Sequence, residues 1–299
     1  MVLGISIEYT AESIFNFSCD GDASNLRNAI NAVTNINDMY RTSMGSTALH
    51  AAANNSHIDC VRILLDEDID IECKDFRGFT PLHAASMSGS LECCKLIIEK
   101  GAMIENGDFE GFKAIHHASY HGHTDICNLL LENDADINVK TNIGESALFI
   151  ATKYGYIDTA QFLIWRGADV ETSTDNRMKP LHEATARGSI DIVTLLLDYG
   201  ADIESVSDNG ARCVHIAARN GRLGILQLLL RRGALLESLD CDGKSCIHYA
   251  AYYCTENDWI TQANRLDCIR YLLNQGANID LDNLEEGYRT AIELAKSTI

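Results

Sequence analysis

The hexad Thr-Pro-Leu-His-Ala-Ala at residues 80–85 constrains this chain more than any other feature, because altered copies of it return at a fixed interval. The first residues of these copies, called starts below, follow one another every 33 residues: Thr47, Thr80, Lys113, Ser146, Lys179, Arg212 and Ser245. A fixed period of this length indicates one supersecondary unit that is copied and stacked on its neighbours. We therefore expect a solenoid.

Several other positions keep the same period. A histidine stands three residues after six of the seven starts, and Phe149 replaces it in the fourth copy. A glycine stands two residues before every start except the fifth, where Arg177 replaces it. Apolar pairs such as Leu64-Leu65 and Leu229-Leu230 recur further along each copy. Agreement at so many independent positions indicates that the copies share one fold.

The pattern Gly-x-Thr-Pro-Leu-His-x-Ala-Ala, followed by Gly, by an apolar pair and by Gly-Ala, resembles the ankyrin repeat. It is found at residues 78–104 and again, in altered form, at residues 210–235. The resemblance covers residues 10–299 and implies a helix–turn–helix unit, joined to the next by a hairpin, that binds other proteins. The fold class expected is all-α, an ankyrin-repeat solenoid of stacked helix–turn–helix units with β-hairpin-like connecting loops.

The residue chemistry of each copy supports the same fold. The two prolines of the chain, Pro81 and Pro180, each follow a start, where a helix can begin without the missing N–H. A glycine such as Gly89 is suited to the left-handed conformation that ends a first helix. Apolar residues at helical spacing predict a second helix over residues 91–100.

Some copies depart from this pattern. Asp68 and Asp134 stand where the other copies have a glycine, and aspartate accepts a left-handed backbone less well than glycine does. Lys113, Lys179 and Arg212 replace the capping hydroxyl, and a cation at a helix N-terminus opposes the helix dipole. We therefore expect the first and third repeats to be among the weaker ones.

The organisation predicted along the chain is a degenerate N-terminal capping repeat over residues 1–41, seven repeats over 42–284 and a partial capping repeat over 285–299. The seven repeats are expected at about 42–74, 75–107, 108–140, 141–173, 174–206, 207–239 and 240–284. The last of these carries an insertion between its helices at 254–263. The short final unit fits either a half-cap or the end of a repeat domain taken from a longer protein.

Charge and cysteine content limit the classes of partner. The net charge of −19 argues against nucleic acid and anionic membranes, and fits either an acidic coat that keeps the chain soluble or a basic partner. The 11 cysteines include no CxxC pair and are interpreted as buried apolar residues in a reducing compartment. The N-terminus does not resemble a signal peptide, and no apolar run is long enough to span a membrane. We therefore expect no membrane insertion and a location in the cytoplasm or the nucleus. We also expect the chain by itself to be a monomer.

Catalysis and metal binding are the weaker hypotheses. The resemblance implies that the periodic histidines hydrogen-bond locally and tie neighbouring turns together. His117 and His121 lie four residues apart, a spacing that can hold a metal, and His116 and His123 flank them. Phosphate-loop, nucleophile-elbow and HExxH motifs are missing from the sequence. We expect no enzyme activity and no cofactor.

The binding surface predicted is a concave groove formed by the hairpin tips and the first helices. Aromatic side chains contribute a large share of the binding free energy in protein interfaces. A preformed groove also binds its partner without the loss of entropy that ordering a flexible surface would cause. A competing interpretation is that Phe76 and Phe109 pack hairpin on hairpin. Phe79 and Phe112 are equivalent in adjacent repeats and are expected to form a stripe if they stay exposed. The candidate partner-binding residues are Phe76, Arg77, Phe79, Met87, Phe109, Phe112, Tyr120, His121, Tyr154, Arg187, Arg219, Tyr252, Tyr253 and Trp259.

Asn138 is a candidate modification site. Together with Leu130, Asp136 and Ile137 it resembles the pattern that an iron-dependent asparaginyl oxygenase hydroxylates in some ankyrin proteins. The function predicted for the chain is a non-catalytic scaffold or adaptor that binds a partner polypeptide, with a basic or an apolar recognition segment, in the concave groove. The alternative is the recognition domain of a larger enzyme or channel, such as an acyltransferase or a ubiquitin-ligase subunit.

Overall fold

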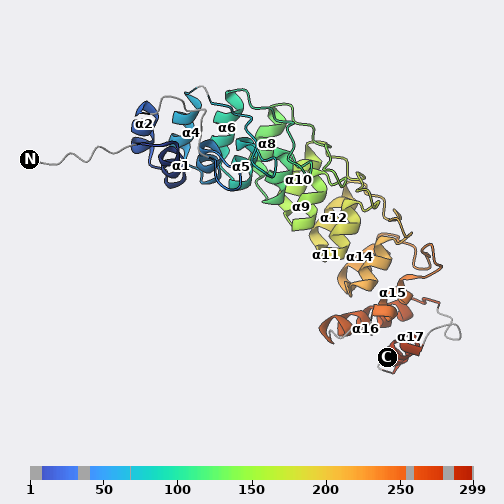
Figure 1. Ribbon diagram of the computed structural model, residues 1–299. Helices are drawn as coiled ribbons and strands as arrows, with labels where there is room; N and C mark the ends of the chain where they lie inside the picture. Colours follow the sequence, from blue (N-terminus) through green and yellow to red (C-terminus); the bar gives the residue numbers. More distant parts are fainter. Residues whose placement is uncertain (1–8, 33–40, 68, 254–258, 279–285, 298–299) are drawn as a thin grey trace, which may run out of the picture. The chain divides into compact units, whose positions relative to one another are not determined.

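The computed structural model describes residues 9–32, 41–67, 69–253, 259–278 and 286–297, with the side chains of residues 253, 259–261 and 286–288 outside that description. The chain forms two compact units, Met1–Ile143 and Gly144–Ile299 (Figure 1). Helices are the regular elements of both units, and the described residues contain no strand. The all-α fold class predicted from the repeat is confirmed.

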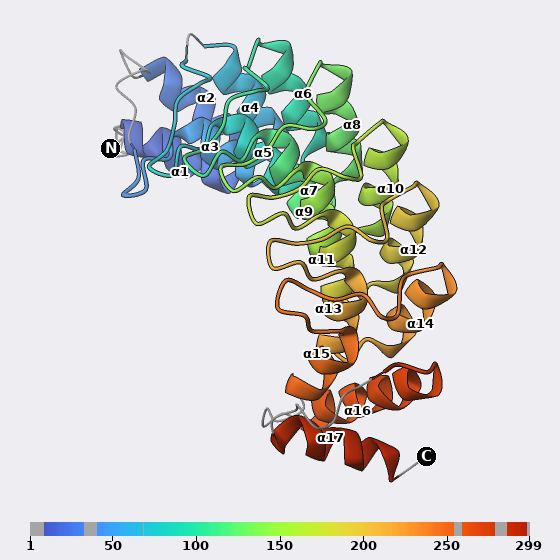
Figure 2. The same cartoon turned by 90° about the vertical axis from the view of Figure 1, so that its right-hand side faces the viewer.

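The first unit contains four helix pairs. Their helices are α1 (Ala11–Asp20), α2 (Ala23–Ala32), α3 (Ala48–Asn54), α4 (Ile58–Leu65), α5 (Pro81–Ser88), α6 (Leu91–Glu99), α7 (Ala114–Tyr120) and α8 (Thr124–Glu132). The first helices α1, α3, α5 and α7 form one row and the second helices α2, α4, α6 and α8 form another (Figure 2). Leu82, Ile97, Ile115 and Leu130 are fully buried between the rows.

The second unit is built from helix pairs of the same kind. Its helices are α9 (Ala147–Tyr154), α10 (Ile157–Trp165), α11 (Pro180–Arg187), α12 (Ile190–Asp198), α13 (Cys213–Arg219), α14 (Leu223–Arg231), α15 (Cys246–Tyr253), α16 (Trp259–Asn274) and α17 (Glu286–Lys296). α16 begins at Trp259, so the described part of the insertion predicted at 254–263 is helical. Among the described residues, none of the helices combines the length and the apolar character that crossing a lipid bilayer requires.

Helix α5 begins and ends as its sequence predicts. Thr80 is the residue before α5, its hydroxyl lies 3.0 Å from His83 Nδ1, and its backbone N–H donates to the same nitrogen at 2.9 Å. Pro81 occupies the first helical position, where no N–H is needed. Gly89 ends the helix with a φ of 78°, a left-handed conformation in which a side chain would be strained.

Periodic histidines tie their repeats to the following loop in both units. His83 Nε2 lies 3.0 Å from the carbonyl oxygen of Asn106, and His116 Nε2 lies 2.9 Å from that of Val139. In the second unit His182 Nε2 lies 3.0 Å from the carbonyl oxygen of Ser205. Because these rings are buried and bonded at both nitrogens, their local structural role is confirmed.

The departures from the repeat pattern have visible consequences. Asp134 adopts a φ of 66° and Arg177 a φ of 55°, in the left-handed region that glycine fills elsewhere, while Asp68 lies outside the described residues. The cations that replace a capping hydroxyl each pair with a glutamate eight residues earlier: Lys113 with Glu105, Lys179 with Glu171 and Arg212 with Glu204. These ion pairs offset part of the unfavourable dipole interaction that the sequence predicts.

Candidate functional site

The hairpin tips that precede α5 and α7 are each organised by their first residue. Asp75 Oδ1 accepts hydrogen bonds from the backbone N–H groups of Arg77 at 2.8 Å and Phe79 at 2.9 Å. Asp108 does the same for Glu110 at 2.9 Å and Phe112 at 2.8 Å. A carboxylate in this position leaves its second oxygen, Oδ2, available for a further partner.

Consecutive tips in the first unit are joined by backbone hydrogen bonds. The N–H of Phe76 donates to the carbonyl of Met44 at 2.9 Å, and the N–H of Phe109 donates to that of Arg77 at 3.1 Å. The Phe109 ring lies against Gly78, where a Cβ would stand 2.9 Å from the ring carbon Cδ1. Phe76 nevertheless stays 65% exposed and Phe109 67% exposed. Each ring therefore packs against the preceding tip, as one interpretation expected, and also presents apolar surface to solvent, as the binding interpretation expected.

A hollow of about 560 Å³, called the aromatic hollow below, opens between two tips and two first helices of the first unit. Seven of the predicted partner-binding residues line it, together with three that the prediction left out. The seven are Arg77, Phe79, Met87, Phe109, Phe112, Tyr120 and His121, and the three are Asp108, Glu110 and His117. The structure thus brings half of the predicted set to one place.

The expected stripe of Phe79 and Phe112 is interrupted by a histidine. The ring centroid of His117 lies 4.9 Å from that of Phe79 and 5.5 Å from that of Phe112. Both phenylalanines are half-buried. The stripe was expected only if both rings stay exposed, and this condition is not fully met. The sequence signal for the intervening ring was a histidine at position 117, where four other repeats have alanine or isoleucine.

His117 is fixed by Asp108 at the floor of the aromatic hollow. Its Nε2 lies 3.2 Å from Asp108 Oδ2, and both side chains are nearly buried. Burial opposes the ionisation of Asp108, but the hydrogen bonds from His117 and from the Phe112 and Glu110 N–H groups outweigh it and lower the pKa of Asp108. Asp108 is therefore ionised at neutral pH.

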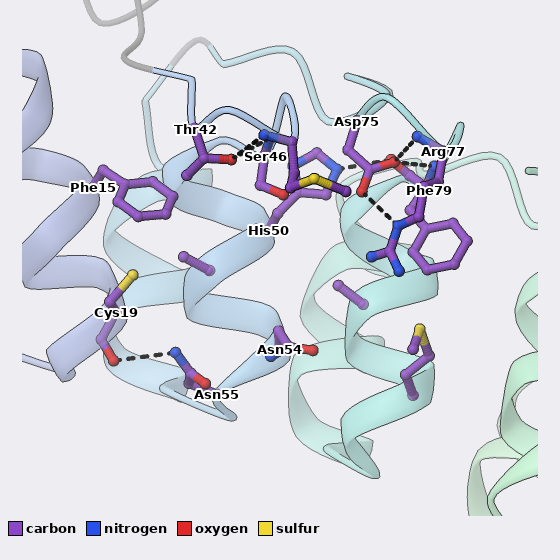
Figure 3. A pocket seen from close by; sticks show the side chains of 14 residues that line it. Phe15, Cys19, Thr42, Ser46, His50, Asn54, Asn55, Asp75, Arg77 and Phe79 are labelled. Carbon is purple, nitrogen blue, oxygen red and sulfur yellow. Dashed lines mark hydrogen bonds and ion pairs between the residues drawn. The ribbon is translucent and has the colours of Figure 1, made fainter.

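Arg77 forms the rim between the aromatic hollow and a neighbouring one. Its guanidinium carbon lies 4.2 Å from the Phe79 ring centroid, and its Nε lies 3.6 Å from Asp75 Oδ2 (Figure 3). The neighbouring hollow of about 380 Å³ extends to Phe15 of α1 and Asn54 of α3. Arg77, Phe79 and Met87 line both hollows, so the two form one groove along the first helices of this unit.

The hollows of the second unit are lined largely by polar side chains. Arg219 lines two hollows, of about 220 and 580 Å³, and the smaller of them also includes Tyr252. Lys244 Nζ lies 5.6 Å from the ring centroid of Tyr252, while Arg187 pairs with Glu183 at 2.8 Å. Tyr154 is exposed. The side chains of Tyr253 and Trp259 lie outside the described residues, so their predicted role stays a prediction.

The histidines that suggested a metal site are engaged elsewhere. Both nitrogens of His116 are used by the backbone of Lys113 and Val139, and His123 Nε2 lies 3.3 Å from the Met87 carbonyl oxygen. His121 lies just beyond the end of α7, and its ring stacks on that of His123. The described residues contain no group of three or more His, Cys, Asp or Glu side chains suited to a metal ion.

Asn138 lies on an exposed loop of the first unit. Its backbone N–H donates to Asp136 Oδ1 at 2.9 Å, which forms a local turn. Glutamates occupy the equivalent positions 72 and 105, and each accepts a hydrogen bond from the backbone of the next repeat. Nothing in this geometry tests hydroxylation, which stays a prediction.

Stacked helix pairs, histidine ties to the next loop and hairpin tips joined in series define a helical repeat protein with an open groove. The chain belongs to the ankyrin-repeat family: the family model described as ankyrin repeats (3 copies) matches residues 18–108, 67–141, 115–207 and 181–283. The crystal structure of the human ASB11 ankyrin repeat domain is similar, with a TM-score of 0.67 and 27% sequence identity over 74% of this chain and 98% of that domain. No curated protein sequence matches significantly. Ankyrin repeats are generally protein–protein interaction modules.

Proposed function

We propose that this chain is a non-catalytic scaffold or adaptor that binds an extended segment of a partner polypeptide in the groove of the first unit. The observation that carries the proposal is the aromatic hollow, whose walls present apolar side chains to solvent and include Phe109, which is 67% exposed. Exposed aromatic surface next to a hollow is typical of a contact site.

The arrangement of the groove suits a polypeptide. Two hollows share one rim, so successive side chains of an extended segment can occupy them in turn. Arg77 and Glu110 at the tips supply polar contacts around an apolar centre, as in other protein interfaces. Helices and tips are tied together by hydrogen bonds, so little conformational entropy is lost when a partner binds.

A peptide-display selection on the full chain tests this function. Tyr120→Ala and Met87→Ala remove wall side chains of the aromatic hollow without touching the buried core. Trp165→Ala is the matched control, because Trp165 is a 71% exposed aromatic at the end of a second helix. We expect the wall variants to weaken the selected peptides by about 1–3 kcal/mol and the control to leave them unchanged. Equal loss in all three variants, or none, would contradict the proposal.

A further inference from the structure

One ring nitrogen at the floor of the aromatic hollow is left unused by the part of the chain that the structure describes. The residue that carries it, His117, is only 7% exposed. Its Nε2 is bonded to Asp108, and its ring contacts Phe79, His83 and Phe112. Its Nδ1 has no hydrogen-bond partner among the described residues, although the imidazole lines the hollow. Nδ1 is therefore the ring atom through which His117 can bind a ligand in the hollow.

The partner of His117 decides what Nδ1 can bind. An ionised carboxylate only accepts hydrogen bonds, so Nε2 must carry the hydrogen that Asp108 Oδ2 receives. In the neutral imidazole Nδ1 is then a lone-pair acceptor. The group that completes the floor of the hollow must be a hydrogen-bond donor.

The charge around the hollow favours a cationic donor. Arg77 is already paired with Asp75, whereas Asp108 and the exposed Glu110 add two negative charges to the lining. The first unit as a whole, residues 1–143, has 21 Asp and Glu against 9 Lys and Arg, a difference of −12. The aromatic walls add to this preference, because ring faces attract cations. Arg77 shows that they do so here, since its guanidinium covers Phe79 at 4.2 Å.

We propose that the aromatic hollow is a recognition site for a lysine side chain of the partner polypeptide. The apolar stem lies along Met87 and Phe112, and the ammonium group donates to His117 Nδ1 while facing Glu110. Lysine suits the site better than arginine, because one recessed acceptor matches a compact ammonium group rather than a planar fork. This inference rests on the proposed function, and it specifies the residue that the groove selects.

Replacement of lysine by norleucine in the groove-binding peptides tests the inference. Norleucine keeps the four-carbon stem and removes only the ammonium group. We expect one lysine in each peptide whose replacement weakens binding at least tenfold, measured by titration calorimetry with the full chain. Glu110→Gln should reduce this lysine dependence several-fold, and Glu99→Gln, an exposed carboxylate at the end of α6, should leave it unchanged.

A second readout observes Nδ1 itself. Long-range ¹H–¹⁵N spectra of the imidazole should show the His117 Nδ1 signal moving with the lysine peptide and staying in place with its norleucine counterpart. Peptides that bind in the groove without any lysine dependence, or that prefer tyrosine at this position, would overturn the lysine site alone. If no peptide depends on Tyr120 and Met87, the proposed function is wrong and the lysine site falls with it.

Discussion

Asp108 and His117 fix each other between two hairpin tips: Oδ2 of the aspartate lies 3.2 Å from Nε2 of the histidine, while Oδ1 accepts two backbone N–H groups of its own tip. One carboxylate therefore shapes the tip and orients the ring at the floor of the aromatic hollow. The equivalent pair in the second unit is Asp240 and Tyr249, whose hydroxyl donates to Oδ2 at 2.7 Å. The same tip geometry thus supports different groove chemistry in different repeats.

Substitution of Asp108 separates these two roles. Asp108→Ala leaves two backbone donors and His117 without their acceptor, and we expect a loss of about 2–3 kcal/mol in the free energy of unfolding. Asp108→Asn keeps an acceptor for the backbone, so its loss should be about 1 kcal/mol. Denaturant titration at neutral pH measures both. Equal losses would contradict the assignment of two roles to one carboxylate.

The difference in the free energy of unfolding between the wild type and Asp108→Asn should depend on pH. The pKa of Asp108 is lowered in the folded state, because hydrogen bonds outweigh the effect of burial. The contribution of Asp108 to the free energy of unfolding is therefore fully present above its ordinary pKa of 3.8, and it is lost as the pH falls through the lower pKa of the folded state. Unfolding free energies of the two proteins should converge below about pH 4. A difference that grows on acidification would contradict this sign.

The buried histidines should make the protein sensitive to mild acid. Burial lowers the pKa of His83 from 6.5 to about 3, with a smaller contribution from neighbouring His117. Below about pH 6.5 the unfolded chain therefore binds a proton at His83 that the folded chain excludes. The free energy of unfolding decreases as the pH falls below this value. We expect His83→Gln to reduce the slope of unfolding free energy against pH at pH 5 by about 1.4 kcal/mol per unit. An unchanged slope would show that His83 titrates normally.

Two glycine substitutions measure the contact between consecutive tips. Gly78 and Gly101 have similar left-handed backbones, with φ of 85° and 92°, so alanine costs about 1 kcal/mol of backbone strain at either. At Gly78 the added Cβ would also meet the Phe109 ring and its backbone nitrogen at 2.9 Å, whereas at Gly101 nothing lies within 4 Å. We expect Gly78→Ala to cost about 1–3 kcal/mol more than Gly101→Ala in thermal unfolding. Equal costs would mean that the tips do not pack tightly.

Relief of strain at Asp134 should stabilise the first unit. Asp134 has a φ of 66° at the position where other repeats carry glycine. Asp134→Gly should raise the free energy of unfolding by up to about 1 kcal/mol, since glycine adopts this conformation without steric cost. The reciprocal variant Gly101→Asp should lower it by a similar amount, as space around Gly101 is open. Calorimetry that shows Asp134→Gly to be destabilising would contradict the strain argument.

Much of the fold could be predicted because each local signal repeats. The hydroxyl, proline, histidine and glycine around Thr80 specify one helix start and one helix end, and the period copies this result along the chain. The exposed aromatics at the tips were predicted as well, since the tip position follows from the repeat.

The chemistry of the groove was harder to predict. The pairing of Asp108 with His117 joins residues nine positions apart, and no other repeat contains this combination. The ion pair of Lys113 with Glu105 likewise depends on how the loop returns to the helix start. A histidine at position 117, where four other repeats have alanine or isoleucine, was the available signal. Such pairings depend on three-dimensional packing, which periodicity does not encode.

Site-specific photocrosslinking tests the central claim most directly. A benzoylphenylalanine is placed at Tyr120, on the wall of the aromatic hollow, or at Trp165, on a second helix of the other unit. With a peptide selected on the full chain, irradiation should join the peptide to position 120 and leave position 165 unreacted. Crosslinking at position 165 without crosslinking at position 120 would show that the partner binds elsewhere, and would contradict a groove that grips polypeptide.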